Sequence, residues 1–322
     1  MLKTRLTVML GIDHPIVLAP MGSATSPAFA AAVSNAGALG SIGTLNRPLD
    51  VILRDLRAIR GLTSKPFAIN HIPTLLMEEA FQATLDLRPA VVSFALGDPG
   101  DLVRRVHDAG SLAQAQVTTV AQASQAAERG VDIIVAQGSE AGGHAGTVST
   151  LALVPQVVDA VSPLPVIAAG GIFDGRGLAA ALLLGAVGVN LGTRFLASHE
   201  APIDAGWQRR ILDACSEDSV KAEALNAIYP EPGTVGYGTA PRALRSPFID
   251  HWNANLEAAG RNREALRAEL TAMASEGRRH EIYSAAGQSA GGVRDVISVE
   301  AIICRIVEEA ERALSRGLAV VM

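Results

Sequence analysis

The sequence predicts an α/β fold, a (β/α)8 TIM barrel with a helical insertion near the C-terminus. Short apolar runs rich in β-branched residues alternate with segments of helical length as far as about residue 196. There are eight such runs, and this number favours a closed barrel over an open, doubly wound sheet. The open alternative is also disfavoured because its Gly-x-Gly-x-x-Gly fingerprint is absent after the first predicted strand.

The predicted strands are short and largely apolar, as expected for a parallel sheet that is buried on both faces. They cover residues 15–19, 38–42, 66–70, 91–95, 112–116, 132–136, 165–169 and 188–191. The segments between them predict helices over residues 27–35, 49–59, 76–87, 101–108, 119–129, 150–160 and 175–184. Asp174 is the expected N-cap of the last of these helices, and Gly185 is its expected stop.

The pattern changes after about residue 202. Helices are predicted over 207–215, 219–227 and 248–274 without strands between them, and a loop rich in Pro and Gly over 229–241. The stretch 261–279 is dense in Arg and Glu and is interpreted as a solvated helix face. A final helix, capped by Ser298, keeps its apolar residues in the i, i+3, i+4 rhythm. The predicted organisation is a barrel over 1–202, a helical cap over 203–284 and a return to the barrel over 285–322.

Composition limits the classes of function. The 322 residues carry a net charge of −5 with no Lys/Arg block, which argues against a nucleic-acid partner. The two cysteines, Cys215 and Cys304, lie far apart, so neither a disulfide scaffold nor a metal site is expected. Neither a signal peptide nor an apolar run long enough to span a membrane is found. We therefore expect a cytoplasmic protein with no membrane partner.

One loop combines glycines with a titratable ring. Residues 136–146 follow the sixth predicted strand and contain Gly142, Gly143 and His144. Loops at the carboxyl ends of barrel strands carry the chemistry in this fold class, and glycine lets a flat cofactor approach the backbone. His144, with a reference pKa near ~6.5, is a candidate acid or base. The alternative is a surface loop with a solvated histidine.

A phosphate site is predicted after the seventh and eighth strands. The seventh strand ends at Ala169 and is followed by Gly170 and Gly171, and the eighth is followed by Gly192 and Thr193. Backbone N–H groups of such loops commonly bind phosphate in barrel enzymes, and the Thr193 hydroxyl adds a donor. Each glycine pair taken alone could be an ordinary turn.

Other strand ends supply groups suited to a heterocycle. The first strand leads into Ala19, Pro20 and Met21, and Asn70, Gln116 and Gln137 stand at the ends of the third, fifth and sixth. Amides can pair with the pyrimidine edge of a ring; amides satisfied by the backbone are the alternative. A phosphate site, amides and a glycine bed beside His144 together describe a site for FMN.

The combined motifs resemble the nitronate monooxygenase family, formerly called 2-nitropropane dioxygenases. They are Ala-Gln-Gly-Ser-Glu-Ala-Gly-Gly-His at 136–144, Pro-Val-Ile-Ala-Ala-Gly-Gly-Ile-Phe-Asp-Gly-Arg-Gly at 165–177 and Asn-Leu-Gly-Thr-Arg-Phe at 190–195. The resemblance extends to Ala-Pro-Met at 19–21, Pro-Phe-Ala-Ile-Asn at 66–70 and Ala-Gly-Gln-Ser-Ala-Gly at 286–291, and so covers nearly the whole chain. Flavin-dependent enoyl-ACP reductases and some NADH:quinone reductases share these motifs.

The resemblance implies an FMN-dependent enzyme that oxidises alkyl nitronates, or nitroalkanes, with O2 to carbonyl compounds and nitrite. His144 would be the catalytic base, Gly142 and Gly143 would lie near the flavin ring, and Gln288 with Ser289 would come back over the site. The expected partners are a small-molecule substrate and O2, and the chain could form a homodimer. An NAD(P)H-dependent flavin reductase acting on quinones or enoyl-ACP is the alternative function, and a flavin-binding protein without turnover is a third.

Overall fold

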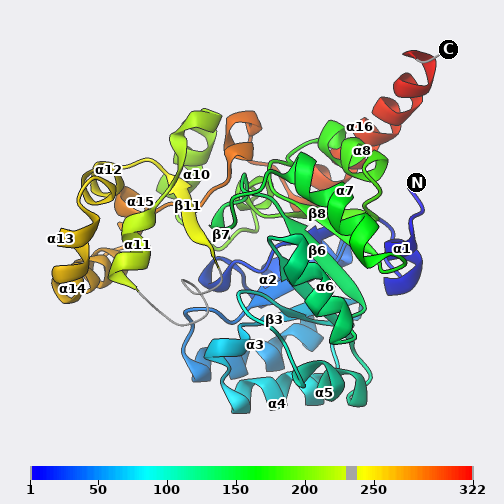
Figure 1. The fold of residues 1–322 in the computed structure, drawn as a ribbon, viewed down its shortest axis with the longest axis horizontal. Helices are drawn as coiled ribbons and strands as arrows, with labels where there is room; N and C mark the ends of the chain where they lie inside the picture. The colour runs from blue at the N-terminus through cyan, green and yellow to red at the C-terminus, as the bar shows by residue number, and fades with distance from the viewer. Residues whose placement is uncertain (1, 230–237, 321–322) are drawn as a thin grey trace.

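The computed structural model describes residues 2–229 and 238–320 and places eight parallel strands at the centre of the molecule (Figure 1). The strands follow the order β1-β9-β8-β6-β5-β4-β3-β2. A parallel bridge between Val17 and Leu39 joins β1 to β2, so the sheet closes into a barrel. All eight predicted strands and the predicted fold class are confirmed. Their bounds are β1 Ile16–Leu18, β2 Gly40–Gly43, β3 Phe67–His71, β4 Val91–Phe94, β5 Leu112–Val117, β6 Ile133–Gln137, β8 Val166–Ala169 and β9 Gly188–Leu191.

A helix follows each of the first seven barrel strands, as predicted. Asp174 caps the last of these helices by accepting a hydrogen bond from the N–H of Gly177, and Gly185 follows it with φ +91°, a conformation that glycine adopts without strain. The helices are α2 Pro27–Asn35, α3 Leu49–Leu62, α4 Glu78–Leu87, α5 Leu102–Asp108, α6 Val120–Glu128, α7 Thr150–Val161 and α8 Gly175–Leu183.

The interior of the barrel is filled by its own side chains and by an N-terminal helix. Leu6 and Leu10 of α1 (Arg5–Leu10) are buried in one cluster with strand residues such as Ile133 and Ile167. Helix α1 is not among the predicted helices, because its apolar run is very short. A larger core, which includes Phe29 and Phe94, fills the space between the strands and the surrounding helices.

The last helix, α16 (Val299–Val320), packs against α8 and α2 and completes the outer layer. The Ser298 hydroxyl accepts from the N–H of Ala301 at 3.2 Å, which confirms the predicted cap. The buried face includes Ile302, Ile306 and Ala310, as the helical periodicity predicted. Figure 1 shows the C-terminal turns of α16 extending beyond the barrel. No helix within the described ranges is long and apolar enough to cross a membrane.

The cap lies to one side of the barrel (Figure 1), and two of its predicted helices differ from the prediction. The predicted helix 219–227 begins as a strand, β10 (Ser219–Lys221), before α11 (Glu223–Ile228). The predicted helix 248–274 is three helices, separated near Asn255 and Asn262, because asparagine favours helix ends over helix interiors. They are α12 Pro247–Asn253, α13 Leu256–Arg261 and α14 Arg263–Ser275; α9 Thr193–Leu196 and α10 Ala205–Asp213 precede β10, and α15 Arg279–Ile282 ends the cap.

A small antiparallel sheet connects the cap to the barrel. Its order is β10-β11-β7, where β11 is Ala240–Leu244 and β7 is Gly143–Ala145. The strand β7 belongs to the loop after β6, yet it pairs with the cap (Figure 1). This sheet is not predicted from the sequence, because Pro241 argues against a strand and β7 is very short. Most of the predicted loop 229–241, namely 230–237, lies outside the described residues.

Candidate active site

A cavity of about 210 Å³ lies at the carboxyl ends of the barrel strands and reaches the cap. The structure brings almost all residues predicted for the site around this one cavity. They are Ala19, Pro20, Met21, Asn70, Gln116, Gln137, Gly142, Gly143, His144, Ala169, Gly170, Gly171, Gly192 and Thr193. The role of each residue toward a cofactor stays a prediction.

Gln288 is the predicted site residue that does not line the cavity. It begins a 3-10 turn (Gln288–Gly292), and its backbone N–H donates to the carbonyl of Glu140 at 2.9 Å. The next residue, Ser289, does line the cavity. The segment therefore returns to the site as predicted.

The glycine loops present backbone to one end of the cavity. Gly170 and Gly171 have φ of +103° and +73°, which side chains rarely adopt. At Gly170 a Cβ atom would lie 2.9 Å from the Thr150 hydroxyl, so there is also no room for one. On the neighbouring loop, the Thr193 hydroxyl accepts from the N–H of Gly287 at 2.9 Å and keeps its own proton for a further acceptor. These loops suit an anion such as phosphate.

Asn190 lines the cavity but is not among the predicted site residues. It lies on β9, and its buried Oδ1 has no hydrogen-bond partner among the described residues. An unpaired buried acceptor costs roughly 1–3 kcal/mol, so a ligand that donates to it would be stabilised. The sequence did carry a signal, because Asn190 is the one amide in an otherwise apolar strand.

The three predicted amides are positioned by their neighbours. Asn70 donates through Nδ2 to the Ser93 hydroxyl at 3.0 Å, which leaves Oδ1 as its acceptor. Gln116 donates through Nε2 to Gln137 Oε1 at 3.1 Å. This bond leaves a free acceptor on Gln116 and free donors on Gln137. Together the amides can serve both donors and acceptors of a heterocycle.

Gly142 is required by the protein itself. A Cβ atom there would lie 2.7 Å from the backbone nitrogen of Gly287. The loop therefore packs directly on the C-terminal segment, a contact that accounts for this glycine whether or not a ring lies nearby. Gly143, with φ +68°, begins β7 next to it.

His144 lies on β7 opposite Pro241 of the cap strand β11. The pKa of His144 is lowered to about 4, first by burial and second by the positive charge of Lys221. The ordinary value expected from the sequence is therefore wrong in this structure, because the cap covers the ring. The imidazole is neutral at physiological pH and can accept a proton or a hydrogen bond.

The cap contributes three cavity residues that are not among the predicted site residues. Trp207 of α10, Arg279 and Tyr283 all line the cavity. The sequence predicts a solvated helix face over 261–279, and this prediction is wrong for Arg279, which is half-buried and lines the cavity. The Arg and Glu residues of this stretch follow no pattern in the sequence that distinguishes Arg279, which faces the cavity, from the others.

Two of the three described non-glycine residues with positive φ line the cavity, and the third, Arg88, ends α4. Asn46 and Leu96, both with φ +57°, are non-glycine residues in the left-handed region and both line the cavity. Such conformations cost of the order of 1–3 kcal/mol and tend to occur at functional sites. Asparagine adopts this conformation readily, so Leu96 is the more strained of the two.

The family model for nitronate monooxygenase matches residues 3–80 and 77–309. This chain belongs to the nitronate monooxygenase family. A nitronate monooxygenase of Paraburkholderia phytofirmans is 37% identical over 273 residues, which is 70% of this chain and 74% of that protein. Another relative is (3aS,4S,5R,7aS)-5-hydroxy-7a-methyl-1-oxo-octahydro-1H-indene-4-carboxyl-CoA dehydrogenase of Mycobacterium tuberculosis, 35% identical over 80% of this chain and 71% of that protein. This member of the nitronate monooxygenase family is an oxidoreductase.

Two solved structures match nearly all of this nitronate monooxygenase family member. FabK of Thermotoga maritima is 33% identical with a TM-score of 0.88, covering 99% of this chain and 100% of that one. Nitroalkane oxidase of Streptomyces ansochromogenes is 28% identical with a TM-score of 0.84, covering 97% and 99%. The barrel and its cap are therefore shared with these relatives as one architecture.

Proposed function

We propose that this protein is an FMN-dependent nitronate monooxygenase, which oxidises alkyl nitronates, and nitroalkanes less well, with O2 to carbonyl compounds and nitrite. The observation that carries the proposal is the cavity itself, where a neutral His144 shares one space with two phosphate-suited glycine loops. The family match and the likeness to a nitroalkane oxidase support the same chemistry.

The cavity fits FMN on its own features. The loops of Gly170, Gly171, Gly192 and Thr193 would hold the phosphate. The Oδ1 of Asn190, which has no hydrogen-bond partner among the described residues, would accept a hydrogen bond from the cofactor. Met21, Asn70, Gln116 and Gln137 would line the ring and ribityl chain. FMN is favoured over FAD because the barrel offers one phosphate site and no Rossmann half for an adenosine. When bound, the flavin would supply the electron transfer between substrate and O2.

His144 would act on the substrate's proton. With a neutral nitroalkane, a ring nitrogen of His144 would accept the α-proton. A base with a pKa of about 4 holds a proton weakly, so this transfer is uphill. An alkyl nitronate has already lost that proton, and we therefore propose nitronates as the better substrates.

A second candidate is an NAD(P)H-dependent flavin reductase acting on quinones or enoyl thioesters. The relative named as a carboxyl-CoA dehydrogenase favours it, because a CoA compound is a thioester. Both candidates use the same cavity and differ in what reduces the flavin.

One experiment separates the candidates. The protein is purified with its flavin, and the released cofactor is chromatographed; FAD in place of FMN would contradict the proposal. The holoprotein is then mixed anaerobically with NADH or NADPH while the flavin absorbance is followed. Slow or absent bleaching, together with O2 uptake that depends on an alkyl nitronate, supports the monooxygenase. Rapid bleaching supports the reductase. If the protein shows neither bleaching nor nitronate-dependent O2 uptake, it is a flavin-binding protein without turnover.

A further inference from the structure

The cavity carries one permanent charge. Of the described residues that line it, none is Asp, Glu or Lys, and burial keeps His144 neutral. Arg279, on α15 of the cap, is the single arginine among them. The described side chains that line the cavity therefore carry a single positive charge, and it lies on the cap.

The guanidinium of Arg279 is poorly satisfied. Its Nη1 lies 3.5 Å from the Ser23 hydroxyl, at the limit of a hydrogen bond, and its Cζ lies 5.6 Å from the centre of the Tyr283 ring. No carboxylate of a described residue forms a salt bridge with it. Its neighbour Arg278 differs, since it pairs with Glu276 at 3.1 Å and Glu281 at 2.8 Å. Most of the five N–H donors of Arg279 thus remain available to a ligand.

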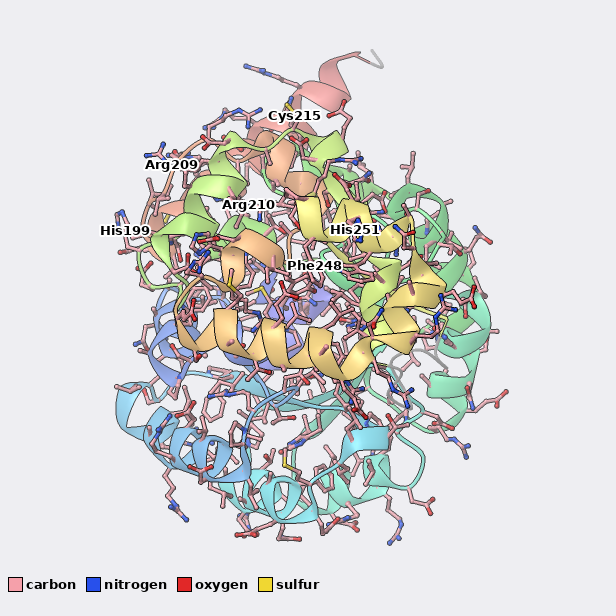
Figure 2. All side chains as sticks on the ribbon, turned by 90° about the vertical axis from the view of Figure 1, so that its left-hand side faces the viewer. His199, Arg209, Arg210, Cys215, Phe248 and His251 are labelled. Atoms are coloured by element: carbon pink, nitrogen blue, oxygen red, sulfur yellow. The ribbon has the colours of Figure 1, made fainter. Side chains whose placement is uncertain are left out.

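The backbone next to Arg279 is held firmly in place. Arg210 of α10, labelled in Figure 2, donates from Nη1 to the carbonyl of His280. The His280 ring lies 2.7 Å from Asp204 and packs on Gly206, where a Cβ atom would lie only 2.4 Å from the ring. These contacts with α10 therefore fix the backbone from which the Arg279 side chain extends, before any substrate arrives. A preorganised binding group loses less entropy when its ligand binds.

We propose that Arg279 binds a planar oxyanion of the substrate and so makes the enzyme selective for anionic substrates, an inference that rests on the proposed function. A nitronate and a carboxylate share this chemistry, because each presents two terminal oxygens that divide one negative charge. That geometry matches the fork of a guanidinium, which lysine does not reproduce. The bound anion is either the reacting nitronate or a carboxylate carried elsewhere on the same substrate.

Binding of unreactive probes tests the inference without turnover. Hexanoate and hexanamide have the same chain and differ in charge, and their binding to the holoprotein can be followed by calorimetry or by the fluorescence of Trp207, which lines the cavity. In Arg279→Gln we expect the Kd for hexanoate to rise about 10- to 100-fold, the usual worth of hydrogen bonds to a charged group. Hexanamide should bind equally to both. Arg279→Lys should restore only part of the affinity for hexanoate.

Arg278→Gln is the matched control, because Arg278 is adjacent but paired outside the cavity. It should bind hexanoate as the wild type does. If Arg279→Gln bound hexanoate unchanged, or lost hexanoate and hexanamide equally, the inference would be overturned. The second result would mean that Arg279 only supports the packing of Tyr283.

Kinetics then identify which oxyanion is bound. A KM increase in Arg279→Gln for propane-2-nitronate, with kcat retained, places the nitronate itself at Arg279. An increase confined to a nitronate that also carries a carboxylate places the carboxylate there. An unchanged KM for both would contradict the inference. If no nitronate is oxidised at all, the proposed function fails, while the hexanoate measurement still decides the role of Arg279.

Discussion

Lys221 of the cap lowers the pKa of His144 on the barrel loop. Its Nζ donates to the carbonyls of Ala145 and Gly146 at 2.5 and 2.8 Å, directly after His144 along the chain. Burial, with the nearby charge of Arg242, lowers the pKa of Lys221 itself to about 8. Lys221 is therefore still largely charged at neutral pH. A residue of the cap thus helps to set the protonation state of the proposed base.

Replacing Lys221 should raise the pKa of His144. In Lys221→Met the coulombic part of the shift disappears while burial remains, so we expect a rise that falls short of the ordinary value. NMR titration of the histidine ring signals would measure it. Two carbonyls also lose their donor, which should cost roughly 1–3 kcal/mol of stability. Lys65→Met, at an exposed lysine, is the control; an equal pKa in all three proteins would contradict the coupling.

Removing the His144 ring should separate proton abstraction from binding. His144→Ala should retain FMN, because other loops supply the predicted phosphate and ring contacts. Its activity with neutral nitroalkanes should fall by about two to four orders of magnitude, the usual contribution of a positioned acid or base. Activity with preformed nitronates should fall much less. Oxygen consumption at matched flavin content measures both, and equal losses would show that His144 binds or orients the substrate instead.

A carboxylate at Gly171 should exclude the phosphate. Gly171→Asp adds a negative charge at the proposed phosphate loop, and its Cβ atom would lie 3.4 Å from that of Glu140. We expect a folded protein without flavin, measured by the ratio of flavin to protein absorbance. Gly171→Ala is the matched control, because it carries the same strain at φ +73° without the charge. Full flavin occupancy in Gly171→Asp would mean that the phosphate binds elsewhere.

Acidification should destabilise the fold through buried histidines. Burial lowers the pKa of His71 to about 4, and its Nε2 lies 2.9 Å from the Thr84 hydroxyl. Between about pH 6.5 and 4 the unfolded chain binds a proton that the folded ring does not. Stability is therefore complete above about pH 6.5 and falls as the pH approaches 4, by up to about 3 kcal/mol for this residue.

The measurement is urea unfolding at several pH values. His71→Gln cannot titrate in this range, so its unfolding free energy should fall less steeply with acid than that of the wild type. If the unfolding free energy changed with pH by the same slope in the wild type and in His71→Gln, His71 would take no part in the acid sensitivity.

The barrel and most cavity residues were predictable because they depend on local sequence. The glycine pair after Ala169 stands directly behind an apolar strand, and the eight strands fix that loop at the carboxyl end of the barrel. The neutral state of His144 was not predictable in this way. It depends on burial by the cap and on Lys221, which chain folding brings close.

The small sheet and Arg279 escaped prediction for different reasons. All five residues of β11 are buried, but Pro241 argues against a strand there, so the sequence does not predict it. Arg279 looks like the other charged residues of its stretch, and only the position of α15 over the cavity distinguishes it from Arg278. Contacts between segments distant in sequence decide both features.

The shared strand β7 has a consequence for protein engineering. Excising the cap to obtain a minimal barrel would remove β11 and leave the N–H and C=O groups of β7 without partners. An unpaired strand edge is a template for aggregation. The excision would also expose the His144 ring to water and return its basicity toward that of free histidine. Chimeras that exchange caps among relatives should therefore transfer β10, β11 and the matching β7 together.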